Sequence, residues 1–72
     1  MKILIFKTDI ESEPGVDRVS SLLNEHPIIT RWSIDTDDVD NVLRIEAMRS
    51  LQEREVIELV AEHGFTCEEL PD

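Results

Sequence analysis

The one thiol of this 72-residue chain, Cys67, is the side chain with the most obvious reactive chemistry. A single cysteine excludes an internal disulfide, and it excludes a tetrahedral metal site built from several cysteines of one chain. Cys67 has no resolving partner, and its neighbours Glu68 and Glu69 should raise the pKa of the thiol rather than lower it. We therefore expect Cys67 to serve as a small apolar strand residue.

Carboxylates that follow the first apolar run could bind a hard cation instead. Asp9, Glu11 and Glu13 lie there at every second position. The chain changes conformation over this stretch and nothing makes the three groups converge, whereas Ca²⁺ takes about 6–8 oxygen ligands. Weak, nonspecific cation binding is the most that we expect from this loop.

A second acidic stretch carries part of an EF-hand pattern. Asp35, Asp37 and Glu46 stand at the first, third and twelfth places of such a loop. Val39 supplies no oxygen at the fifth place, and Asp40 replaces the glycine required at the sixth. The pattern therefore favours a solvated hairpin tip, where Asp and Asn residues make the turn.

No group of residues has the arrangement of a catalytic site. His26 and His63 each lie near the end of an expected helix, and neither stands beside a nucleophile motif. A paired general acid and base is lacking, as is a glycine-rich phosphate loop. We predict that the protein is not an enzyme and uses no cofactor.

The charge balance narrows the choice of partner. Lys and Arg number 7 and Asp and Glu number 17, which gives a formal net charge of −10. This charge disfavours nucleic acid and anionic membrane surfaces and favours a protein with a basic surface. The first apolar run, Ile3 to Phe6, is too short for a secretory signal or a membrane span, so we expect a cytoplasmic protein.

Three stretches have the hydrophobic pattern of strands. An apolar run predicts a strand from Ile3 to about Ile10, and period-2 alternation predicts strands over Ile28–Ile34 and Val42–Ala47 with a turn between them. Lys7 and Thr8 interrupt the first run, and we expect both at a solvated edge of the core.

Helical spacing of apolar residues predicts two helices. The first extends from about Glu13 to Glu25, with Ser12 as its N-cap. The second follows a capping box of Ser50 and Glu53 and ends at Gly64. A short strand over Phe65–Leu70 and a frayed tail, Pro71–Asp72, complete the chain.

The predicted order of elements is βαββαβ. Right-handed crossovers place both helices on one face of a four-stranded antiparallel sheet, which is the α+β, ferredoxin-like arrangement. We expect residues 1–72 to form a single domain.

A spaced set of residues connects the first strand to the first helix: Ile10, Ser12, Gly15, Val19 and Leu23. The set resembles the heavy-metal-associated domains of copper chaperones and metal-pumping ATPases, in which Met-Thr-Cys-x-x-Cys precedes a Val and a Leu of the first helix. Segments elsewhere that resemble this family are Trp32–Asp35, Val60 and Gly64–Phe65.

Both metal-ligand positions of that family are substituted here. Ser12 stands for the first cysteine and offers a hard, weak ligand, and Gly15 stands for the second and has no side chain. The resemblance therefore implies a degenerate member that has lost its metal site. Ser12 has a sufficient structural role as an N-cap, whose loss to alanine would cost about 0.5–2 kcal/mol.

Trp32 has two interpretations. It is either the largest member of the core or part of a docking patch on the sheet face that the helices leave open, together with Ile28, Thr30 and Ile34.

Two functions follow from these observations. The leading hypothesis is a binding module that meets a partner through the open sheet face or the acidic loop, with Glu11, Glu13 and Trp32 as candidate contacts. Like-folded domains meet each other in the resembled family, which implies a like-folded partner or a homodimer. The alternative is residual metal handling by Cys67 or the loop carboxylates, with a dimer supplying the missing ligands.

Overall fold

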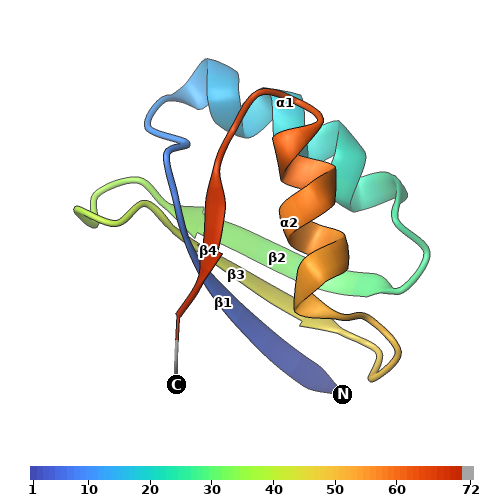
Figure 1. Cartoon of the computed structure of the whole chain (residues 1–72). Coiled ribbons are helices and arrows are strands. Elements are labelled where there is room, and N and C mark those ends of the chain that lie inside the picture. The colour runs from blue at the N-terminus through green and yellow to red at the C-terminus, as the bar shows by residue number, and fades with distance from the viewer. Residues whose placement is uncertain (71–72) are drawn as a thin grey trace.

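The elements form in the order that the hydrophobic periodicity predicts. The computed structural model describes residues 1–70, and the predicted tail Pro71–Asp72 lies outside them. Along the chain the elements are β1 (Lys2–Thr8), α1 (Glu13–Glu25), β2 (Ile29–Asp35), β3 (Val42–Ala47), α2 (Glu53–Ala61) and β4 (Cys67–Glu69). Figure 1 shows the two helices above the sheet.

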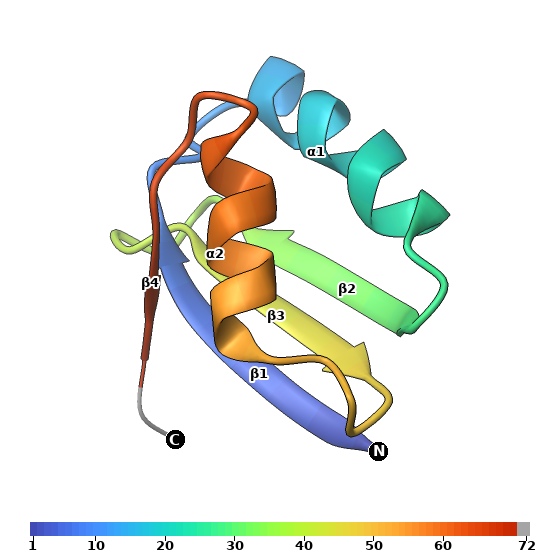
Figure 2. The same cartoon turned by 45° about the vertical axis from the view of Figure 1, so that its right-hand side comes forward.

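The four strands form one antiparallel sheet in the order β2-β3-β1-β4. Figure 2 shows α1 and α2 on the same face of this sheet, so that the other face has no helical cover. The ferredoxin-like βαββαβ prediction is confirmed. Within residues 1–70, no helix has the length and apolar character that a membrane crossing needs.

The core lies between the helices and the covered face of the sheet. Alternate residues of the central strands point into it, which is why Leu4 and Phe6 of β1 are buried while Ile3 is exposed. Each helix contributes residues four positions apart on one side. The fully buried residues of the core are Phe6, Ile10, Val19, Leu23, Leu43, Ile45, Ala47, Leu51, Val56 and Val60.

Helix α1 has the predicted limits and the predicted N-cap residue, but the capping hydrogen bond expected from the Ser12 side chain is missing. Ser12 occupies the N-cap position with an extended backbone, and its carbonyl accepts the Val16 N–H at 3.0 Å. Its hydroxyl makes no capping hydrogen bond. Pro14 in the first turn and the exposed, solvated helix end are sufficient for the helix to begin without that bond.

The capping box predicted for α2 is also wrong. The helix begins at Glu53 with Gln52 at the N-cap position, and no side chain caps it. Leu51 explains the later start because it is fully buried and its N–H donates to the Met48 carbonyl, which keeps Ser50 in the preceding turn. The other end matches the prediction, since Gly64 adopts φ +87° just beyond the helix.

The first and last strands of the chain, β1 and β4, are shorter than predicted. β1 ends at Thr8 instead of Ile10, and Thr8 is buried rather than placed at a solvated edge. The Thr8 hydroxyl donates to the Asn41 carbonyl at 2.6 Å and accepts the Ile10 N–H at 3.2 Å. These bonds satisfy the buried hydroxyl and turn the chain out of the sheet. β4 is confined to Cys67–Glu69 because Phe65 belongs to the end of α2.

Candidate functional site

Residues 9–15, which connect β1 to α1 and include the first turn of α1, are here called the ligand loop. One side of this loop packs on the core, and the other side is exposed to solvent. Ile10 is fully buried, whereas Glu11, Ser12 and Glu13 are exposed. The buried isoleucine anchors the loop to the core. The side chain at the first ligand-equivalent position, Ser12, therefore faces solvent. Gly15, at the second position, has no side chain.

Gly15 is the buried member of the loop. Its backbone is helical, so a side chain there is not prevented by a left-handed conformation. The space is nevertheless tight, because a Cβ atom at this position would lie 3.3 Å from Ile10 Cγ2 and 3.3 Å from Phe65 Cζ. A side chain at position 15 would therefore require Ile10 and the Phe65 ring to shift by a few tenths of an ångström.

Phe65 is held over Gly15 by the connection between α2 and β4. The left-handed Gly64 turns the chain, and the Phe65 N–H donates to the Val60 carbonyl at 3.3 Å. The Arg18 guanidinium of α1 lies 5.6 Å from the centre of the ring, within the range of a cation–π contact. The sequence shows Gly64–Phe65 as a segment that resembles the family, but it predicts only a strand role for Phe65.

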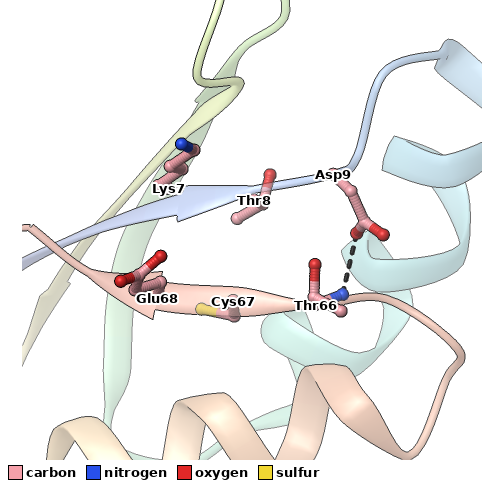
Figure 3. A pocket seen from close by; sticks show the side chains of 6 residues that line it. All are labelled: Lys7, Thr8, Asp9, Thr66, Cys67 and Glu68. Carbon is pink, nitrogen blue, oxygen red and sulfur yellow. Dashed lines mark hydrogen bonds between the residues drawn. The ribbon is translucent and has the colours of Figure 1, made fainter.

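The loop carboxylates are not brought together. Asp9 accepts the Thr66 N–H at 2.8 Å, which directs it towards β4, as Figure 3 shows. In the part of the chain that the structure describes, no three His, Cys, Asp or Glu side chains are grouped to hold a metal ion. The loop therefore presents separate negative charges.

Cys67 lies in a shallow hollow between the ends of β1 and β4 (Figure 3). Burial raises the pKa of the thiol to about 12, and the Asp9 carboxylate adds to the shift. The predicted direction is confirmed, but the causes differ from those inferred from the adjacent glutamates. Because metal binding requires the thiolate, a thiol that stays protonated at neutral pH is a poor ligand.

The acidic stretch after β2 is a hairpin turn, as predicted. Asp35 Oδ1 accepts the Asp37 N–H at 3.1 Å, and Asp38 Oδ1 accepts the Asp40 N–H at 2.8 Å. Asn41 completes the turn with φ +46°. These carboxylates satisfy the turn's own backbone.

The two histidines stand at helix ends, where the sequence placed them. His26 Nδ1 accepts the Ile28 N–H at 3.4 Å, and His63 Nδ1 lies 3.1 Å from the Leu59 carbonyl oxygen. Each ring is thus used locally, next to its own helix.

Trp32 lies on the face of the sheet that the helices cover. It pairs with the buried Ile45 of β3 and packs against the core, and its Nε1–H donates to Asn24 Oδ1 of α1 at 2.8 Å. The core interpretation is correct, and the placement on the open face is wrong. The reason is that β2 pairs with β3 in the register that aligns Trp32 with Ile45. A role for Trp32 in partner binding stays a prediction.

Solved structures with this fold include copper-handling domains. The yeast copper transporter domain Ccc2a, solved in apo and Cu(I)-loaded states, matches with a TM-score of 0.84 and 18% identity over 100% of this chain and 99% of that chain. A chain of the Atx1–Cu(I)–Ccc2a complex matches with a TM-score of 0.85, 18% identity and the same coverage. A structure described under crosstalk between Cu(I) and Zn(II) homeostasis matches with a TM-score of 0.83 and 6% identity over 97% of this chain and 100% of that chain.

These likenesses show that the chain has the fold of heavy-metal-associated domains, as the resemblance implied. No protein-family model matches the chain, and no curated protein matches its sequence. The chain combines this fold with one cysteine, which lies on β4 and outside the loop that carries Ser12 and Gly15.

Proposed function

We propose that the protein is a binding module with the heavy-metal-associated fold, in which the ligand loop docks a protein and does not hold a soft metal ion. The observation that carries the proposal is the absence of a ligand side chain at Gly15, against which Phe65 and Ile10 pack so closely that even a Cβ atom would make tight contacts with both. Above this packed layer the loop exposes the carboxylates of Glu11 and Glu13.

Charge determines the kind of partner that suits this surface. The loop and the end of α2 lie at the same end of the molecule (Figure 1), and Glu62, the C-cap residue of α2, is exposed. A net charge of −10 accelerates encounter with a basic surface and opposes association with acidic ones. The proposed partner is a cytoplasmic protein with a basic docking surface.

A like-folded domain is the partner class with the best support. The structural neighbour Ccc2a forms a Cu(I) complex with Atx1. We extend to this chain only the idea that the fold docks another domain, here without metal, and we place the docking surface at the loop because Glu11 and Glu13 are exposed there. The alternative of residual metal handling is weakened by the raised pKa of Cys67. A catalytic role has no support from the sequence, which lacks a nucleophile motif and a paired general acid and base.

A titration with a basic, like-folded domain tests the proposal. Amide chemical shifts of the labelled chain should change around residues 10–15 and 65 at about 0.1 M NaCl, and the affinity should fall at about 1 M NaCl because the Debye length shortens. Changing Glu11→Lys together with Glu13→Lys should weaken binding by at least about tenfold.

The matched control changes Glu55→Lys together with Glu58→Lys, which alters the net charge by the same amount on α2. This control should weaken binding less than the loop variant does. Equal losses in both variants would show a general charge effect without a docking surface, and shift changes away from the loop would contradict the proposal.

A further inference from the structure

The two edges of the sheet differ in length and charge. β4 forms one edge with three residues, two of which are Glu68 and Glu69. β2 forms the other edge with seven residues and pairs regularly with β3 from position 31 to position 35. Figure 2 shows β2 at the margin of the sheet, where its outer backbone groups have no strand partner among residues 1–70. An edge of this kind can accept another strand.

The side chains of the β2 edge are sorted between the two faces. Arg31, Ser33 and Asp35 are exposed on the open face, where Arg31 Nε lies 3.8 Å from Glu46 Oε2 of β3. Trp32 and Ile34 lie on the covered face and are only partly buried, because no strand flanks them on the outer side.

We propose that a second copy of this chain pairs with β2 in an antiparallel arrangement centred on Ser33. A two-fold axis there places Arg31 opposite the partner's Asp35, and it repeats this pair on the other side of the axis. On the covered face, Trp32 lies opposite the partner's Ile34, again twice. Each pair combines side chains of one face, as antiparallel pairing requires, and joins opposite charges or apolar groups.

Neighbouring registers lose these pairs. Moving the axis to Trp32 places Arg31 opposite the partner's Ser33, and moving it to Ile34 places Asp35 opposite the partner's Ser33. Pairing two β4 strands would bring glutamates together, and like charges on facing strands are destabilising. The charges on β2 therefore select one register at one edge.

The association should be weak and should strengthen with salt. The regular ladder ends at a bulge between Ile29 and Arg31, so the paired stretch is short and the interface falls in the small, transient class. Two copies of net charge −10 repel each other, and added salt screens this repulsion. Docking of a basic partner at the loop weakens with salt instead, so either proposal can fail without the other.

Sedimentation velocity of the full chain tests the pairing. In reducing buffer, at concentrations from about 20 μM to about 1 mM, the protein should show a monomer–dimer equilibrium that strengthens between about 0.1 M and 1 M NaCl. In the wild-type chain, amide shifts that depend on concentration should lie within residues 30–36.

Charge exchange supplies the decisive variants. Arg31→Asp and Asp35→Arg each place like charges opposite one another, so each variant alone should dimerise at least about tenfold more weakly. An equimolar mixture of the two variants restores opposite charges at both pairs and should associate about as well as the wild type. Glu68→Arg matches Asp35→Arg in charge and should leave the dimer in place.

Three results would overturn the pairing. These are a wild-type chain that stays monomeric at the highest concentration in 1 M NaCl, single variants that associate like the wild type, or a mixture of the two variants that fails to associate. Retention of the wild-type thermal transition by each variant shows that lost association is not lost folding. Loss of the dimer in Glu68→Arg would place the contact at β4 and contradict the proposal.

Discussion

The ligand loop and the hollow beside Cys67 each meet one requirement of a soft-metal site and lack another. The loop has the position that the resemblance to heavy-metal-associated domains assigns to the metal, but it carries Ser12 and Gly15, and Phe65 packs tightly against Gly15. The hollow has the thiol, but burial and Asp9 hold that thiol in its protonated form. A soft-metal site needs free space and an ionisable thiol at the same position, because neither substitutes for the other.

The largest expected effect comes from rebuilding the loop. Ser12→Cys with Gly15→Cys supplies two thiols, but the new side chain at position 15 makes a tight contact with the Phe65 ring. Adding Phe65→Ala removes this contact, and we expect the triple variant to gain one-to-one Cu(I) affinity by several orders of magnitude over the wild type. The double variant should gain much less.

A competition titration against a chromogenic Cu(I) chelator measures this gain, with Ser12→Cys alone as the control. Phe65→Ala removes a partly buried ring and should destabilise the fold by about 1–3 kcal/mol, so a melting curve must accompany each titration. Equal affinities in the double and triple variants would show that Phe65 does not close the loop.

Among the loop residues, the buried Ile10 should contribute most to the free energy of unfolding. Ile10 is fully buried, so Ile10→Ala should lower the free energy of unfolding by about 2–5 kcal/mol. Urea denaturation measures this loss, and Glu11→Ala next to it should change stability by less than about 0.5 kcal/mol. Similar losses in the two variants would mean that the loop is not fixed from below.

The environment of Cys67 in the hollow predicts slow alkylation of its thiol. With a pKa of about 12, Cys67 should react with iodoacetamide at pH 8 roughly 10²–10³ times more slowly than a free thiol, and its rate should still rise above pH 10. Asp9→Asn keeps an oxygen acceptor for Thr66 N–H and removes the charge, so it should lower the pKa part of the way. A rate that levels off near pH 9 would contradict the buried environment.

The raised pKa of Cys67 also determines how the free energy of unfolding changes with pH. A thiol whose folded pKa exceeds its unfolded value of 9.0 keeps its full contribution below pH 9, and this contribution is lost as the pH rises towards 12. Cys67→Ser should reduce this alkaline loss in a series of melting curves.

The smallest effect is expected at Ser12. Its hydroxyl makes no capping bond, so Ser12→Ala should cost less than about 0.5 kcal/mol and not the 0.5–2 kcal/mol of a typical N-cap. Chemical denaturation measures the difference, with Ser12→Gly as a backbone control. A loss above about 1 kcal/mol would show that the hydroxyl does cap the helix in solution.

Local signals predicted most of the fold. Pro14 near the start of α1 and Pro27 after its end define that helix, and Val19 and Leu23 place it on the core. The order of elements then follows from short-range periodicity and the handedness of crossovers.

The site was less accessible to sequence reasoning because it depends on contacts between distant residues. Phe65 meets Gly15 across 50 positions of the chain, and no local pattern encodes that approach. The burial of Thr8 depends in the same way on the Asn41 carbonyl. The prediction for the start of α2 is wrong for another reason, because burial of Leu51 outweighs the capping signal of Ser50.

Competition for Cu(I) by the wild-type chain tests most directly the proposal that this chain carries no working soft-metal site. Reduced wild type and Cys67→Ser would be titrated side by side against a chromogenic Cu(I) chelator. We predict that the wild type takes no more copper from the chelator than a protein with one buried thiol does, and that Cys67→Ser takes still less. One-to-one binding that survives Cys67→Ser would contradict the account, because it would require ligands in the loop that Ser12 and Gly15 do not provide.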